Sequence, residues 1–284
     1  RTGADPWIVV PLVYSTVEAS NLIEYLAGDS ETVYGAKRSA RGRQVPWTSA
    51  FSKIHMELGN EAWNGVFRGG NLEHSASYGT RAQTIFTAMR RAASFDSAKF
   101  DLIIGGQAVW TGRNREIQAA CNNNDTFAIA PYMMYEVNAW TNHQQLFAPL
   151  FAESEMNCRT GVARQNREML NAFSRQIPLS VYEINLHTTG GSIPQEALDA
   201  LTPSLGAGIA VANSMLQMLR DLNIRDQVFY SLPQIYFQRS DGKKVRLWGA
   251  VIDMGVTDRR RPQYLALQLV NKTISAATMI VTTH

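Results

Sequence analysis

The chain has 284 residues, of which 45% are hydrophobic and 18% are charged. This composition is that of a globular protein with a sizeable core, and it excludes a disordered chain. The net charge of +3 and the pI near 8.9 are too weakly basic, and the charge too evenly spread, to predict a nucleic-acid partner. Because no run of about 18 apolar residues occurs, no membrane partner is predicted either.

The strongest signal along the chain is the alternation of short apolar strands with helical patterns. Strands are predicted near residues 7–13, 54–61, 102–106, 126–134, 179–186 and 228–232. Helices are predicted near residues 19–27, 74–93, 113–120, 146–173, 195–222 and 261–274. This alternation predicts a parallel α/β sheet with right-handed crossovers. Residues 29–50 are predicted to form a loop, and residues 233–253 a β excursion around Ser240-Asp241-Gly242.

Cysteine and histidine spacings exclude the commonest metal sites. Cys121 and Cys158 have neither a close spacing nor a metal-ligand spacing, so we interpret them as free thiols, with one disulfide as the alternative. The five histidines lack a spacing such as H-E-x-x-H, and no phosphate-binding glycine loop occurs, so no metal or cofactor is predicted. The chain begins without a Met or a signal peptide, and a secreted or periplasmic location is one option.

Polar side chains interrupt the strand predicted over residues 54–61. His55, Glu57, Gly59 and Glu61 share one face of this strand, because successive strand residues alternate between faces. Two carboxyl groups and an imidazole are costly to bury unless that face opens on a polar site. Here His55 is interpreted as hydrogen-bonded and Glu57 as structural. Glu61 ends the strand, where α/β barrels carry catalytic groups; a structural Glu that caps the loop or pairs with an Arg is the alternative.

A second carboxylate, Glu183, lies near the C-terminal end of the strand predicted over residues 179–186. A Glu in an apolar strand is rare unless it has a partner or a chemical role, and pairing with an Arg is the alternative. Two such glutamates are what glycoside hydrolysis needs, one protonated to give its proton to the leaving oxygen and one ionised to attack the anomeric carbon. Carboxyl groups about 5–5.5 Å apart would give retention through a covalent intermediate. Asn60 could bind a sugar hydroxyl or cap the loop.

The segment His55-Met56-Glu57-Leu58-Gly59-Asn60-Glu61 resembles the E-(L/I)-G-N-E strand of the clan A retaining glycoside hydrolases, most of all the arabinofuranosidase-type members. The resemblance implies an α/β fold of the (β/α)8 TIM-barrel type in a bacterial hydrolase of carbohydrate metabolism. It implies that Glu61 is the general acid/base at the end of the fourth barrel strand. It also implies that Glu183 is the nucleophile at the end of the seventh, with two strands between them.

The resemblance also implies an oligosaccharide or polysaccharide substrate and suggests residues that contact it. Tyr132 is a candidate to orient the nucleophile, Trp248 is a candidate sugar platform, and His187 is a candidate to tune a carboxylate. The candidate substrate-binding residues are Asn60, Trp63, Tyr132, His187 and Trp248. Trp110 and Trp140 are weaker candidates for stacking on a sugar, and core or loop packing is the alternative for each tryptophan.

Only six strands are predicted, which would be strands three to eight of such a barrel. A closed barrel of this type has eight strands. We therefore expect residues 1–275 to form a partial barrel that an upstream segment or a second chain completes, and residues 276–284 to begin a following β segment. The segments Trp63-Asn64-Gly65 and Asn185-Leu186-His187 depart from the pattern of well-studied arabinofuranosidases, which leaves the sugar open.

Two functions are compatible with these patterns. The first is a retaining O-glycosidase, arabinofuranosidase-like, that cleaves O-glycosidic bonds by a two-glutamate double displacement. The alternative is a catalytically silent carbohydrate-binding or assembly protein that kept the barrel, because a fold does not determine a function. The presence of both glutamates favours the enzyme, and the missing strands favour the silent protein.

Overall fold

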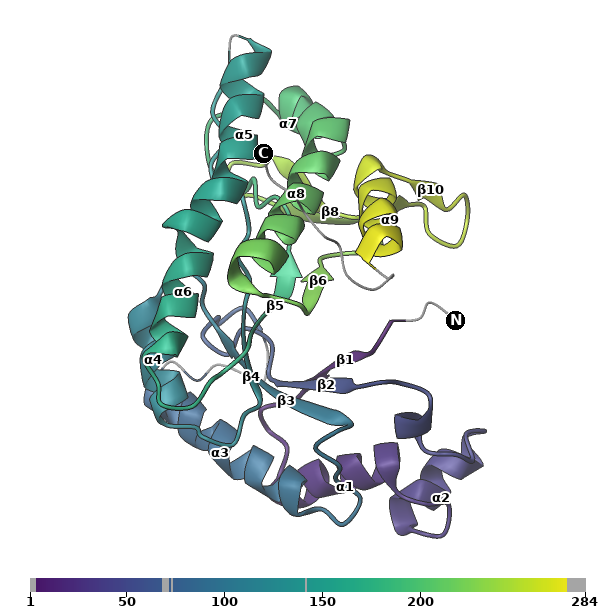
Figure 1. Cartoon of the computed structure of the whole chain (residues 1–284). Helices are drawn as coiled ribbons and strands as arrows, with labels where there is room; N and C mark the ends of the chain where they lie inside the picture. Colours follow the sequence, from purple (N-terminus) through teal and green to yellow (C-terminus); the bar gives the residue numbers. More distant parts are fainter. Residues whose placement is uncertain (1–3, 68–71, 73, 141, 275–284) are drawn as a thin grey trace. The chain divides into compact units, whose positions relative to one another are not determined.

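The computed structural model describes residues 4–67, 72, 74–140 and 142–274 (Figure 1). The chain divides into two compact units. Unit 1 comprises Arg1–Ile129 and Glu168–Ser180, and unit 2 comprises Ala130–Arg167 and Val181–His284.

Six strands form the main sheet, in the order β1-β2-β3-β4-β5-β6. Their bounds are Trp7–Val10 for β1, Ile54–Leu58 for β2, Phe100–Gly106 for β3, Thr126–Ile129 for β4, Leu179–Ile184 for β5 and Gln227–Phe229 for β6. Strands β1 to β4 pair in parallel, and so do β5 and β6. Within the described part of the chain β1 and β6 are the two edges, and no strand pairing closes the sheet. The predicted parallel sheet is therefore confirmed, although most strands end earlier than predicted.

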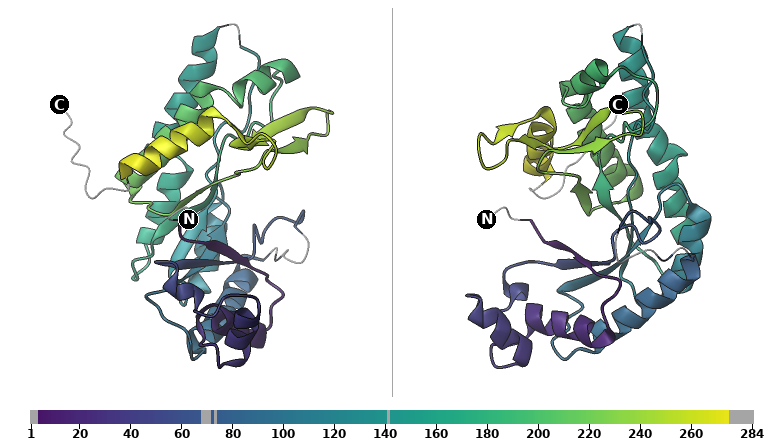
Figure 2. Two further views of the ribbon diagram at one scale, coloured as in Figure 1. Left: turned by 90° about the vertical axis from the view of Figure 1, so that its right-hand side faces the viewer. Right: turned by 180° about the vertical axis from the view of Figure 1, so that it is seen from behind.

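The helices of unit 1 lie along its strands (Figure 2). Their bounds are Thr16–Ala27 for α1, Val33–Ala40 for α2, Ser75–Arg91 for α3 and Thr111–Ala119 for α4, with a short 3-10 helix at Trp47–Ser49. Ser15 and Glu18 form a reciprocal capping box at the start of α1, which satisfies backbone donors that the first turn leaves unpaired. Helix α3 buries one continuous stripe, formed by Tyr78, Ala82, Ile85, Phe86 and Met89. This stripe at helical spacing supplies much of the core of unit 1.

The prediction of a loop over residues 29–50 was wrong, because this segment contains α2 and the 3-10 helix. Thr32 caps α2, and the helix centres on Arg38, whose side chain is fully buried. The guanidinium donates to three backbone carbonyl oxygens at 2.9–3.1 Å, those of Tyr25, Arg43 and Gln44. The buried face of α2 holds Gly35 and Arg38 and no large apolar side chain, so the segment lacks the apolar stripe from which a helix is predicted.

Unit 2 contains the longer helices of the C-terminal half. Their bounds are His143–Arg159 for α5, Val162–Asn171 for α6, Gln195–Leu201 for α7, Leu205–Leu222 for α8 and Pro262–Ile274 for α9. Two segments predicted as continuous helices are each divided in two. The first breaks at Thr160 and Gly161, whose N–H groups both donate to the carbonyl of Met156. The second breaks at Pro203, which has no N–H to donate to the preceding turn.

Unit 2 also contains the predicted β excursion, which forms an antiparallel hairpin and two short strands. Their bounds are Ile235–Gln238 for β7, Lys244–Trp248 for β8, Val251–Ile252 for β9 and Arg259–Arg260 for β10. The predicted turn is present, with Gly242 at a φ of +85° that favours glycine. The strand predicted near residues 277–283 lies outside the described residues. Cys121 and Cys158 are both buried free thiols, as predicted.

No helix within the described ranges is long and apolar enough to cross a membrane.

Replacing Arg38 tests whether its buried hydrogen bonds stabilise unit 1. We expect Arg38→Met to lower the free energy of unfolding by about 3 kcal/mol, because three backbone carbonyl groups lose their donor. Urea denaturation followed by circular dichroism measures this. The exposed neighbour Arg41→Met is the matched control and should change stability by less than about 0.5 kcal/mol. Equal effects of the two substitutions would contradict the role of Arg38.

Candidate active site

Glu61 lies in a turn beyond the end of β2. The strand ends at Leu58, three residues before the predicted end, so the predicted alternation of faces does not extend to Glu61. Gly59 ends the strand at a φ of +72°, and a side chain there would collide with Leu12. Glu61 itself has a φ of +44°, which is uncommon for a residue with a side chain. The N–H of Asn64 donates to the carbonyl of Glu61 at 2.7 Å and closes the turn.

The carboxyl group of Glu61 is largely shielded from water. Burial raises its pKa, and the hydrogen bond from Asn64 Nδ2 to its Oε2, at 2.8 Å, acts in the opposite direction. A carboxyl group with a raised pKa holds a proton at higher pH than an exposed one, which a general acid requires. Asn60 is half-buried immediately before it.

The polar side chains within β2 are hydrogen-bonded in the core. His55 Nδ1 lies 2.8 Å from Asp101 Oδ2, and its ring stacks on that of Trp7. Trp7 Nε1 also donates to Glu57 Oε2 at 2.8 Å. Thr126 donates its hydroxyl to the other oxygen of Asp101 at 2.7 Å. These contacts support the structural interpretation of His55 and Glu57. Asp101 was not predicted as a partner, because it stands at the start of an otherwise apolar strand.

Glu183 is the penultimate residue of β5 and lies in unit 2. The hydroxyl of Tyr132 donates to Glu183 Oε2 at 2.8 Å. Tyr132 reaches this position because Met133 N–H donates to the carbonyl of Asn185, which aligns the segment after β4 with the end of β5. An O–H donor holds a carboxylate in one orientation and favours its charged form. Tyr132 therefore has the geometry of an orienting group, and that role stays a prediction.

His187 lies beside the same tyrosine. Its ring meets that of Tyr132 edge-on at 5.4 Å between centroids and lies 5.0 Å from that of Tyr135. The hydroxyl of Thr189 shares a hydrogen bond of 2.5 Å with Nδ1. Burial lowers the pKa of His187, which favours the neutral imidazole. A neutral ring can accept or donate a hydrogen bond beside Glu183 without adding charge.

The candidate tryptophans have different surroundings. Trp63 is half-buried, and its indole Nε1 is buried without a hydrogen-bond partner among the described residues. Trp110 is 59% exposed at the start of α4. Trp140 packs on the apolar cluster around Leu146 and Ile193, which supports core packing rather than sugar stacking. Trp248 ends β8, and its side chain lies outside the described residues.

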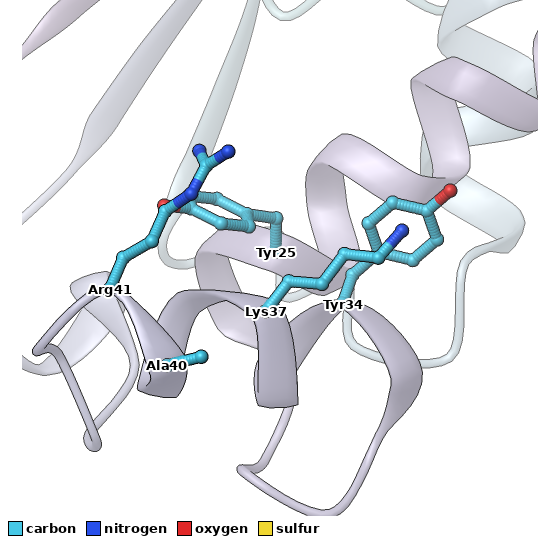
Figure 3. A pocket seen from close by; sticks show the side chains of 5 residues that line it. All are labelled: Tyr25, Tyr34, Lys37, Ala40 and Arg41. Carbon is cyan, nitrogen blue, oxygen red and sulfur yellow. The ribbon is translucent and has the colours of Figure 1, made fainter.

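A surface pocket of about 480 Å³ in unit 1 contains none of the predicted residues (Figure 3). Residues of α1 and α2 and the residue after α2 line it: Tyr25, Tyr34, Lys37, Ala40 and Arg41. Lys37 Nζ lies 4.0 Å from the centre of the Tyr34 ring, a cation–π contact. Such a contact between neighbouring side chains of α2 is accounted for by helix geometry, since residues three apart share a face.

The lowered pKa of His187 predicts a pH dependence of stability. Because the folded protein binds this proton less readily than the unfolded chain, the free energy of unfolding should fall as pH falls below the unfolded pKa of about 6.5. We expect the free energy of unfolding of His187→Phe to fall less between about pH 7 and pH 5 than that of the unmodified protein. Urea midpoints across this range measure it, and the exposed His74→Phe serves as control. A slope unchanged in His187→Phe would contradict the prediction.

Comparison with known proteins adds a family match and a fold match. Residues 11–147 match the family model for the alpha-L-arabinofuranosidase 1 domain. No curated protein matches the sequence.

The fold is similar to those of solved alpha-L-arabinofuranosidases. The enzyme from Thermotoga maritima, in its arabinose complex, has 19% sequence identity and a TM-score of 0.63, over 95% of this chain and 50% of that one. The family 51 enzyme from Thermotoga petrophila has 16% sequence identity and a TM-score of 0.68, and the match covers 94% of this chain and 49% of that one. The family 51 enzyme from Bifidobacterium longum has 16% sequence identity and a TM-score of 0.66, and the match covers 96% of this chain and 53% of that one.

This chain therefore spans about half the length of the solved proteins that it matches. Likeness at this identity establishes the fold, which is that of part of a (β/α)8 barrel. The resemblance to arabinofuranosidase-type glycoside hydrolases is confirmed, both by the family match over residues 11–147 and by the fold.

Proposed function

We propose that this chain contributes the catalytic glutamates of a retaining glycoside hydrolase that acts on α-L-arabinofuranosides. One observation carries the proposal: the two glutamates have different surroundings. Glu61 is half-buried, and this burial raises its pKa, which suits a proton donor. Glu183 accepts a hydrogen bond from Tyr132, which suits an ionised nucleophile.

The order of the strands supports these assignments. Glu61 follows β2 and Glu183 ends β5, so β3 and β4 lie between them in the sheet. Carboxyl groups at the C-terminal ends of parallel barrel strands converge on one face. The proposed retaining mechanism requires about 5–5.5 Å between the two carboxyl groups in the complete barrel. The missing strands would come from an upstream segment or from a second chain.

The proposed reaction has two steps. In the first, the carboxylate of Glu183 attacks the anomeric carbon while the carboxyl of Glu61 gives its proton to the departing glycosidic oxygen. The C–O bond to the leaving group breaks, and an ester to Glu183 forms. In the second, Glu61 takes a proton from water, the water oxygen attacks the same carbon, and the ester bond to Glu183 breaks. The configuration at the anomeric carbon is retained, and both glutamates return to their starting states.

The remaining candidates are assigned to the sugar. Two residues of unit 1 are proposed to contact the substrate. They are Asn60 and Trp63, whose buried indole N–H lies in the turn that carries Glu61. Tyr132 and His187 are proposed to hold Glu183, and Trp248 to stack on the sugar. That a solved relative from Thermotoga maritima was obtained as an arabinose complex supports arabinose as the sugar.

Substitution of each glutamate tests the assignment in the longest natural chain that contains residues 1–284. We expect Glu183→Ala to abolish turnover. Glu61→Ala should slow substrates with poor leaving groups by at least about 10²-fold, yet affect activated aryl arabinofuranosides far less, because only the former need a proton donor. Initial rates on matched aryl and alkyl arabinosides measure this difference. Glu155→Ala, an exposed glutamate on α5, is the control.

Two results would contradict the proposal. Equal losses on both substrate types would exclude Glu61 as the acid/base. Binding of arabinosides without turnover in the unmodified protein would favour the catalytically silent barrel.

A further inference from the structure

We propose that Asn64 is a positioning residue that holds the carboxyl group of Glu61 in one orientation and favours its ionised form. The segment that contains Asn64 departs from the pattern of well-studied arabinofuranosidases, so the family resemblance gives Asn64 no role. The proposal stands on the geometry of the turn. Its catalytic consequence rests on the proposed function of Glu61.

Asn64 is fixed by four hydrogen bonds within its own turn. Its backbone N–H donates to the carbonyl of Glu61 at 2.7 Å, and its carbonyl accepts from the N–H of Phe67 at 3.2 Å. Its side-chain Oδ1 accepts from the N–H of Val66 at 3.1 Å, and its Nδ2 donates to Glu61 Oε2 at 2.8 Å. A hydroxyl could rotate between donor and acceptor roles, whereas an amide cannot exchange its oxygen and nitrogen without a flip.

The bond to Val66 determines which end of the amide faces Glu61. A backbone N–H can only donate, so the atom that it meets must be the amide oxygen. The NH2 group must then point toward Glu61. An NH2 group offers only donors, which pair better with a carboxylate than with the O–H of a protonated carboxyl group. The turn therefore favours the charged form of Glu61, because it directs a hydrogen-bond donor at the carboxyl group.

Among the described residues of unit 1, Asn64 is the one side chain whose hydrogen bond lowers the pKa of Glu61. The charged side chains of β2, α3 and α4 include Glu57, Arg81 and Arg113, and these helices also carry Arg90, Arg91, Arg115 and Glu116. Glu57 accepts from Trp7, whereas Arg81 donates to the backbone carbonyl of Leu12 and Arg113 to that of Leu72. Among the described residues of this unit, none of these charges contributes to the change in the pKa of Glu61, which comes from burial and from Asn64.

The consequence is a balance between two requirements. Burial alone would favour the protonated form, which can give a proton but cannot take one from water. A group that must do both in successive steps works best with a pKa near the working pH. Asn64 offsets the effect of burial, and its rigid turn returns the carboxyl group to the same place after each proton transfer.

A titration of the Glu61 carboxyl carbon by ¹³C NMR tests the proposal without any turnover. The signal is assigned by its loss in Glu61→Gln. We expect Asn64→Ala to raise the midpoint by about one pH unit, because a donor to the carboxylate is lost. Asn64→Asp should raise it further, because a like charge then faces Glu61. The exposed Asn122→Ala, also in unit 1, should leave it unchanged.

The outcomes separate this proposal from the proposed function. An unchanged or lowered midpoint in Asn64→Ala, with the far-UV circular dichroism of the unmodified protein, would overturn the role of Asn64. If Asn64→Ala does not fold, an unchanged or lowered midpoint in the isosteric Asn64→Asp would overturn the role of Asn64 instead. A raised midpoint together with full activity of Glu61→Ala would leave the role of Asn64 intact and refute the assignment of Glu61 as acid/base. In an active protein, the alkaline limb of kcat/KM should move to higher pH with the NMR midpoint.

Discussion

The geometry around Glu61 depends on a single buried hydroxyl group. Tyr78 on α3 donates to the carbonyl of Leu58 at 2.7 Å and accepts from the N–H of Gly105 at 3.1 Å. These backbone groups lie at the ends of β2 and β3, beyond the last paired residues, where parallel strands separate and polar groups would remain buried without partners. Burial strongly raises the pKa of Tyr78, so the hydroxyl stays protonated and can serve both strands. The turn that carries Glu61 begins directly after this bridge.

Unit 2 places its carboxylate in a different way. There the segment after β4 continues alongside the end of β5, and an isolated parallel bridge joins Met133 to Leu186. Met134 and Thr188 both have positive φ values, which are costly for residues with side chains. The N–H of Met134 donates to the half-buried carboxyl group of Glu153 at 2.8 Å, which helps to hold this strained backbone. This irregular extension of two strands positions Tyr132 next to Glu183 and His187 next to Tyr132.

Both glutamates therefore lie where regular strand structure gives way to strained backbone. Strain at a functional site persists only when the surrounding structure holds it in place. In unit 1 the hydrogen bonds of Tyr78 and Asn64 do this, and in unit 2 those of Glu153 and the strand extension do. The sequence shows the glutamates and their order, but not the strain, because φ values are set by contacts between residues distant in the chain. Gly59, whose missing side chain avoids Leu12, is one such case.

The sequence by itself determined the order of the elements, the parallel sheet and the two glutamates near strand ends. It could do so because these depend on local apolar periodicity and on the cost of a carboxylate in an apolar strand. It did not determine α2, because a buried Arg38 bonded to three carbonyl groups leaves no apolar stripe to detect. Nor did it reveal Asp101 or Asn64 as partners, since Asp101 pairs with a residue 46 positions away, and the amide of Asn64 is oriented by a turn that the strand pattern does not predict. Only the three-dimensional structure decided these contacts, because apolar periodicity encodes neither the pairing of distant side chains, as for Asp101, nor the backbone geometry of a turn, as for Asn64.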